Sequence, residues 1–133
     1  MYLVDTNVRS EARRGSPQAQ RWFRSVDPSA VYLSVITLGE IMKGVALRQR
    51  TDTRAAASLR AWLERLRLDH ADRILPVTDA VALEWGRLIA QRPRPILDGL
   101  IAATASVYGK TVVTRNAVDF ADAGVPVINP WQP

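Results

Sequence analysis

Short apolar runs alternate along the chain with longer segments of helical periodicity, and this alternation predicts the fold. The five apolar runs cover residues 2–4, 30–33, 74–77, 111–114 and 125–128. Each run is too short for a helix and contains β-branched or aromatic residues, so each predicts a buried strand. Pro126 lacks a backbone donor, which marks the last run as an edge strand.

Apolar residues at helical spacing predict six helices between these strands. They cover residues 8–14, 17–26, 37–50, a long stretch capped at 51–53, 79–91 and 98–108. The last segment is small and apolar on nearly every side, so it predicts a buried helix that packs closely. No two strands are joined by a tight hairpin turn. The pattern therefore predicts an α/β fold with a parallel sheet in a three-layer α/β/α arrangement, as one domain over residues 1–133.

Composition narrows the class of protein. The chain has 133 residues, 47% hydrophobic and 23% charged, and no cysteine, which excludes disulfides and thiolate metal sites. No apolar run approaches the roughly 18 residues needed to span a bilayer. The first strand begins at the second residue and leaves no room for a signal peptide, so we expect a cytoplasmic protein without membrane contact.

Arginine carries most of the net charge of +5, with 16 Arg against 2 Lys. Its planar guanidinium pairs with phosphate oxygens, so the excess favours a nucleic-acid partner. A biased genome composition would produce the same excess, and sequence does not separate the two causes. Six of these arginines lie on the two helices between residues 37 and 68 and predict either a solvated face or a partner groove. The only histidine, His70, falls in a predicted polar loop and is expected on the surface without a role.

Acidic residues recur where an open α/β sheet binds ligands. Asp5 follows the first strand, Asp119 follows the fourth, and Glu40 and Asp98 fall in the first turns of predicted helices. Carboxylates gathered at one edge repel each other unless they are protonated or hold a cation. Oxygen ligands without Cys or His select a hard ion, Mg²⁺ or Mn²⁺. With arginine nearby, the chemistry that needs this arrangement is metal-assisted phosphodiester hydrolysis.

Each acidic residue also has an ordinary structural interpretation. Asp5 or Asn7 caps the first helix, and Asp98 caps its own helix. Glu40 favours the helix dipole from an exposed position, and Asp119 caps the turn around Phe120. The joint pattern favours the acidic site over these separate explanations.

The motifs resemble those of PIN-domain ribonucleases, in particular the VapC/FitB-type toxins of bacterial toxin–antitoxin pairs. The resemblance covers nearly the whole chain and rests on four ordered segments, together with the closing Asn-Pro-Trp at 129–131. These segments are Leu-Val-Asp-Thr-Asn at 3–7, Ser-Val-Ile-Thr-Leu-Gly-Glu-Ile at 34–41 with Gly44, Asp-Gly-Leu-Ile-Ala-Ala-Thr-Ala at 98–105, and Val-Thr-Arg-Asn at 113–116 with Asp119 and Phe120.

The resemblance implies a five-stranded parallel sheet in the order 3-2-1-4-5. It also implies an endoribonuclease that depends on Mg²⁺ or Mn²⁺, forms a homodimer, acts on RNA and is inhibited by a small cognate antitoxin whose tail fills the active site. Carried over by position, Asp5, Glu40 and Asp98 are the principal acidic residues and metal ligands.

The fourth acidic position departs from the fully acidic form of the family. Asn116 stands where many members have Asp, and Asp119 lies three residues on, so either one completes the site and the number of metals stays open. Thr6 and Thr114 resemble the hydroxyl residues that orient the carboxylates, and Asn7 is a further supporting residue.

Other classes fit less well. A haloacid dehalogenase-type phosphatase needs Asp-x-Asp after its first strand, but Asn7 holds the second position; a receiver domain needs an Asp after the third strand, where Thr78 stands. No Gly-rich phosphate loop with Lys is present. The remaining alternative is a PIN-like protein that binds RNA or an antitoxin without cutting.

Overall fold

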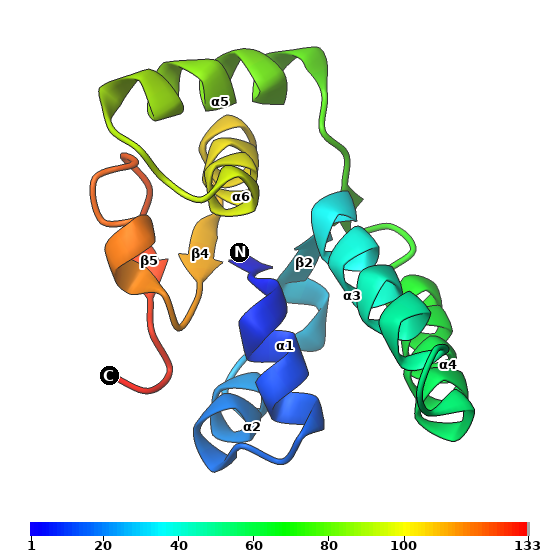
Figure 1. Cartoon of the computed structure of the whole chain (residues 1–133). Coiled ribbons are helices and arrows are strands. Elements are labelled where there is room, and N and C mark those ends of the chain that lie inside the picture. Colours follow the sequence, from blue (N-terminus) through cyan, green and yellow to red (C-terminus); the bar gives the residue numbers. More distant parts are fainter. Residues whose placement is uncertain (133) are drawn as a thin grey trace.

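The computed structural model describes residues 1–132, and its strands form one parallel sheet in the order β3-β2-β1-β4-β5 (Figure 1). The strands are β1 (Tyr2–Val4), β2 (Val31–Ser34), β3 (Ile74–Leu75), β4 (Thr111–Val113) and β5 (Val127–Ile128). In the central strand β1, Leu3 pairs with Tyr32 on one side and with Val112 on the other. The order expected from the family resemblance is confirmed. The direction of winding changes between β1 and β4, which is where open α/β sheets bind ligands.

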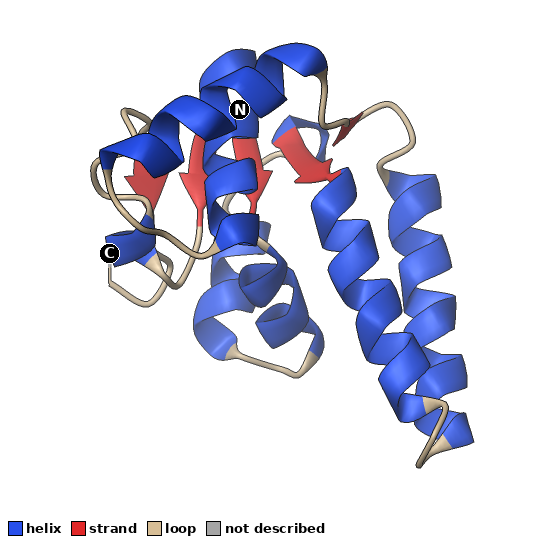
Figure 2. Ribbon diagram, turned by 45° about the horizontal axis from the view of Figure 1, so that its top comes forward, coloured by secondary structure: helices blue, strands red, loops and turns tan. Residues whose placement is uncertain are grey.

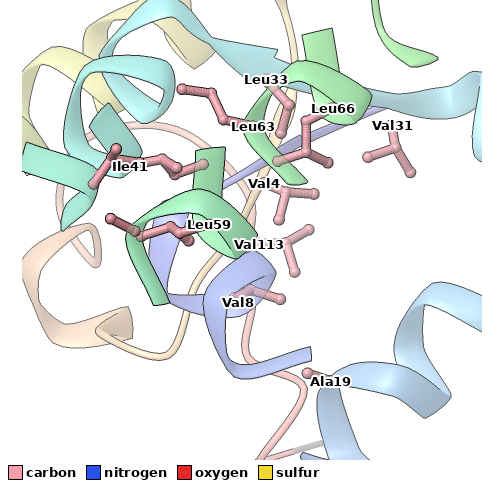
Figure 3. Packing of buried hydrophobic residues seen from close by; sticks show 12 residues of the cluster. Val4, Val8, Ala19, Val31, Leu33, Ile41, Leu59, Leu63, Leu66 and Val113 are labelled. Carbon is pink, nitrogen blue, oxygen red and sulfur yellow. The ribbon is translucent and has the colours of Figure 1, made fainter. Parts of the chain in front are cut away.

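Alternating residues of the strands bury opposite faces of the sheet and make two cores. Val4 and Val113 belong to a core with α1 to α4, part of which Figure 3 shows, whereas Leu3 and Val112 belong to a core with α5 and α6. All four side chains are fully buried. The sheet is therefore the middle layer between two layers of helices, as the apolar pattern predicted, and Figure 2 shows its strands in red among the blue helices.

Six α-helices and two short 3-10 helices connect the strands. They are α1 (Thr6–Arg13), α2 (Pro17–Arg24), η1 (Pro28–Ala30), α3 (Val35–Arg48), α4 (Thr53–Asp69), α5 (Asp79–Gln91), α6 (Ile96–Tyr108) and η2 (Ala117–Asp119). The helices α3 and α4 pack side by side as a hairpin that extends beyond the sheet (Figure 1). Among residues 1–132, no helix combines the length and the apolar character needed to cross a membrane.

Several predicted boundaries differ from the structure for local reasons. The helix predicted from residue 37 begins at Val35, because the hydroxyl of Ser34 accepts a hydrogen bond from the Ile36 amide and caps it. The helix predicted from Asp98 begins at Ile96, directly after Pro95, whose fixed φ suits a helix start. The two edge strands span two residues each, because Pro76 follows β3 and Pro126 precedes β5. Pro126 still accepts the Val112 amide through its carbonyl.

The surface position expected for His70 is wrong, because its side chain is buried at the end of α4. One ring nitrogen, Nδ1, lies 2.9 Å from the Leu66 carbonyl oxygen and the other, Nε2, lies 3.0 Å from Nη2 of Arg9. The carbonyl accepts and the guanidinium donates, so these partners select a neutral ring that is protonated on Nδ1. Arg9 also stacks on Phe23, with 4.1 Å between the guanidinium carbon and the ring centroid. The imidazole therefore joins α1 and α2 to α4.

We predict that His70→Ala destabilises the protein by about 1–3 kcal/mol, because Arg9 and the Leu66 carbonyl lose a buried partner. Burial lowers the pKa of His70, so its contribution to stability is fully present above the unfolded pKa, about 6.5, and is lost as the pH falls below it. Thermal unfolding of both proteins between pH 8 and 5 should show a difference in Tm that shrinks below pH 6.5. A constant difference over that range would contradict the prediction.

Candidate active site

Asp5 stands at the switch between β1 and β4 and is the most buried acidic residue of the site, with 4% of its surface exposed. Its Oδ1 accepts the amide of Thr6 at 2.8 Å, and its Oδ2 accepts the hydroxyl of Thr114 at 2.9 Å. The amide of Asn7 donates to the same Oδ2 at 3.3 Å. The carboxyl group is thus fixed by the first turn of α1 and by the residue that follows β4.

Glu40 approaches Asp5 from α3, where it is the sixth residue and not part of the first turn as predicted. The hydroxyl of Thr6 donates to Glu40 Oε1 at 2.7 Å. The hydroxyl of Thr37, one turn before Glu40, lies 3.0 Å from the Thr6 hydroxyl and is fully buried. Thr6 therefore fixes the positions of both carboxyl groups, through its amide to Asp5 and its hydroxyl to Glu40.

Asp98 comes from the opposite helical layer and is the third residue of α6. Asp119, at the end of η2, contributes to the raised pKa of Asp98, after burial and the charge of Asp5. Gly99 allows α6 to lie close to α5, because a Cβ there would sit 3.2 Å from two atoms of the Trp85 ring. The close helix packing predicted for this segment is confirmed, and it sets the position of Asp98.

A cavity of about 300 Å³ lies over these residues. It is lined by Asp5, Thr6, Asn7, Ser10, Glu11, Arg14, Glu40, Asp98 and Asn116. Asn116 is exposed at the rim, and its amide donates to Thr114 Oγ1. Asp119 does not line the cavity and approaches it through Asp98. Of the two candidates for the fourth position, Asn116 lines the cavity and Asp119 does not.

Burial and like charges make this region unfavourable for carboxylates. Burial raises the pKa of Asp5 to about 6, against the opposing hydrogen bonds from Thr114 and Thr6. The pKa of Asp98 rises to about 7, first through burial, then through the charge of Asp5 and the nearby carboxyl group of Asp119. A proton on one carboxyl group relieves the repulsion between neighbouring carboxylates. Near neutral pH, the cluster thus retains a proton that isolated carboxylates would lose.

The same groups suit a hard divalent cation. Within residues 1–132, no three His, Cys, Asp or Glu side chains are already gathered tightly enough to hold a metal ion. The donors are oxygen atoms, which Mg²⁺ and Mn²⁺ prefer, and burial, followed by like charges, raises the pKa of Asp5 and of Asp98. A cation would replace the proton that the cluster retains and offset the repulsion. The donor chemistry therefore fits a divalent ion that gathers its ligands as it binds.

The ordinary structural interpretations have mixed outcomes. Asp5 does cap α1, in addition to its contacts with Thr114 and Asn7. Asp98 is not a cap, because Pro95 occupies that position and no side-chain bond caps α6. Glu40 is half-buried and bonded to Thr6, so the exposed-dipole interpretation is wrong. Asp119 ends η2, and no side-chain hydrogen bond caps that turn in the described residues.

Sequence reasoning missed the face of α1 that lines the cavity. Ser10 and Arg14 follow Thr6 at intervals of four residues, which places all three on one side of the helix. That spacing is visible in the sequence and would have identified them. Thr37 was missed for the same reason, since it precedes Glu40 by three residues on α3.

Comparisons with known proteins agree with this geometry. The family model of the PIN domain matches residues 2–125. Toxin FitB of Neisseria gonorrhoeae is 37% identical over 98% of this chain and 99% of that protein. VapC ribonuclease Y4jK of Sinorhizobium fredii is 34% identical over 100% of this chain and 99% of that protein. The crystal structure of FitAcB from Neisseria gonorrhoeae superposes with a TM-score of 0.91 at 36% identity, over the full length of both chains.

We predict that Asp98→Asn stabilises the metal-free protein at pH 8 but not at pH 4. The raised pKa of Asp98, about 7, means that its contribution to stability is present below the unfolded value of 3.8 and is lost as the pH rises through 7. After allowance for solvent screening we expect a gain of about 1 kcal/mol, or roughly 3 °C in Tm. Thermal unfolding in a chelating buffer measures it.

Asp27 provides the matched control, because hydrogen bonds from Ser29 lower its pKa and it lies outside the site. Asp27→Asn should gain no stability at pH 8. A lower Tm for Asp98→Asn than for the wild type at pH 8 would show that Asp98 serves the fold as a charged residue.

Proposed function

This chain belongs to the PIN-domain family, and we propose that it is the toxin of a toxin–antitoxin pair, a metal-dependent endoribonuclease. The observation that carries the proposal is the set of carboxyl groups from both helical layers that meet over the β1–β4 switch, with the pKa of Asp5 raised to about 6 and that of Asp98 to about 7. The names of the relatives, a toxin and a ribonuclease, support it.

In this proposal Asp5, Glu40 and Asp98 bind Mg²⁺ or Mn²⁺, and Asp119 completes the site through Asp98. The bound ion supplies a Lewis acid that lowers the pKa of a water and offsets the charge of the phosphodiester. Thr114 and Thr6 keep the Asp5 carboxylate pointed at the cavity, and Thr6 does the same for Glu40. Asn7 and Asn116 supply neutral polar groups beside these carboxylates.

The substrate is RNA, and we propose that its backbone follows a basic groove that leaves the acidic cavity. A second cavity of about 110 Å³ shares Thr6, Ser10, Arg14 and Glu40 with the first and extends to Arg13, Arg48 and Trp62. Arg13 lies over the Trp62 ring, with 5.4 Å between the guanidinium carbon and the ring centroid. Arginines pair with phosphates, and an indole ring can stack on a base.

The partners follow from the family. We propose that a small cognate antitoxin occludes the acidic cavity and this groove, that the toxin forms a homodimer, and that the pair acts in the cytoplasm, where RNA is available. The outer part of the α3–α4 hairpin suits protein contacts, because the exposed Leu47 offers an apolar anchor among the arginines.

We predict that the wild type cleaves RNA with Mg²⁺ or Mn²⁺ and stops when a chelator is added, and that Asp98→Asn loses at least about 100-fold in rate, since it removes a charged ligand. The Asn keeps the shape of the residue, and Asp27→Asn is the control for a surface carboxylate. Sequencing of the 5′ ends of cellular RNA after brief induction would identify the cleaved sites. Wild-type binding of RNA without metal-dependent cleavage would instead favour the non-catalytic alternative.

A second prediction tests the groove. Replacing Arg13 and Arg48 with Gln should weaken RNA binding and lower the slope of log affinity against log salt by roughly 0.7 for each lost phosphate contact. The control pair, Arg54 and Arg60, is exposed on α4 and lies outside the lining of both cavities. An unchanged slope in the first variant, with reduced affinity for the antitoxin, would assign the groove to protein contacts.

A further inference from the structure

Two arginines in the segment before α6 hold the loop that carries Asp119. Arg92 binds Asp122 through Nε, which lies 2.9 Å from one carboxylate oxygen and 2.8 Å from the other. Its Nη2 also donates to the backbone carbonyl of Val118 at 3.0 Å. Arg92 therefore contacts the loop on both sides of Asp119 in the sequence.

Arg94 binds the same loop from a deeper position. Its side chain is 0% exposed, and its Nη1 donates to the backbone carbonyl of Asp119 at 3.2 Å and to Asp122 Oδ1 at 2.9 Å. Its Nε donates to the carbonyl of Leu88 in α5 at 3.4 Å. One guanidinium thus links α5, the segment that leads into α6, and residue 119 itself.

The loop is also held from the inside, because Phe120 is fully buried in the core with α5 and α6. Asp119 is therefore held on two sides, by Arg94 at its own backbone carbonyl and by the buried ring of the next residue, Phe120. Asp98 follows Arg94 by four residues, within the first turn of α6. The same short segment, 92–98, therefore contains Asp98 and the two arginines that hold the loop of Asp119.

We propose that Arg92 and Arg94 are positioning residues that fix the approach of Asp119 to Asp98 and so determine how tightly the acidic cluster binds a divalent cation. The inference rests on the proposed function, since it assumes that the cluster binds metal. Neither arginine touches the reacting atoms, and each acts through the backbone or through Asp122.

The burial of Arg94 distinguishes its pairing with Asp122 from an ordinary surface ion pair. A fully buried guanidinium loses its hydration, and Nη2 of Arg94 is buried without a hydrogen-bond partner, so a surface pair would stabilise the fold at less cost. Arg87 makes such a surface pair, with Nε 2.6 Å from Glu84 and 57% of its side chain exposed. In some proteins, buried charges of this kind specify a conformation at a cost in stability.

The test measures Mn²⁺ binding to the full-length chain by isothermal titration calorimetry, without RNA. Arg94→Met should bind Mn²⁺ about tenfold more weakly, the lower end of the effects seen when hydrogen-bond partners of metal ligands are removed. Arg92→Met and Asp122→Asn should weaken binding by a smaller factor, because each leaves the Arg94 contact with Asp119. Arg87→Met is the matched control and should bind like the wild type.

Hydrogen–deuterium exchange provides a second readout, and amides 117–120 should exchange faster in Arg94→Met than in Arg87→Met. Equal Mn²⁺ affinity in the wild type and Arg94→Met, whatever the loss in Tm, would overturn the inference and leave the proposed function intact. No Mn²⁺ binding by the wild type would overturn both. If Arg94→Met does not fold, Arg92→Met and Asp122→Asn decide by the same criterion.

Discussion

The carboxyl group of Asp5 is buried at the end of the central strand, and much of the surrounding structure serves to keep it there. A carboxylate removed from water is costly unless hydrogen bonds replace the lost hydration. Thr6 and Thr114 supply two such bonds, from the first turn of α1 and from the end of β4. The strand order makes this possible, because β4 returns to lie beside β1 after the chain has built β2 and β3 on the other side.

Two threonines orient the carboxyl groups of the site. Thr6 donates through its amide to Asp5 and through its hydroxyl to Glu40. Thr114 accepts the amide of Asn116 with the hydroxyl that it donates to Asp5. The bonds to Asp5 still do not offset burial and repulsion, since its pKa remains above the usual range. A site that is unfavourable for its own charges when empty is well prepared to bind a cation.

The fold and the acidic residues could be predicted from the sequence because both leave local signals. Strands such as Tyr2–Val4 read as short apolar runs, and a charged residue directly after such a run is conspicuous. Contacts between distant residues leave no such signal. The burial of His70 depends on Arg9, 61 residues away, and the pairing of Arg94 with the Asp119 carbonyl depends on a loop 25 residues away. The helix starts at Val35 and Ile96 were each missed by two residues, because Ser34 and Pro95 begin these helices ahead of the apolar pattern.

The division of the interior into two cores has a mechanical consequence. Asp5 and Glu40 are held by α1 and α3, on the side of the Val4 core, whereas Asp98 and Asp119 belong to segments anchored in the core with Leu3 and Phe120. Between these two bodies runs a sheet whose strands are two to four residues long. A cation bound by carboxylates from both sides would link the two helical layers across the sheet. Local opening of one layer would then be coupled to local opening of the other.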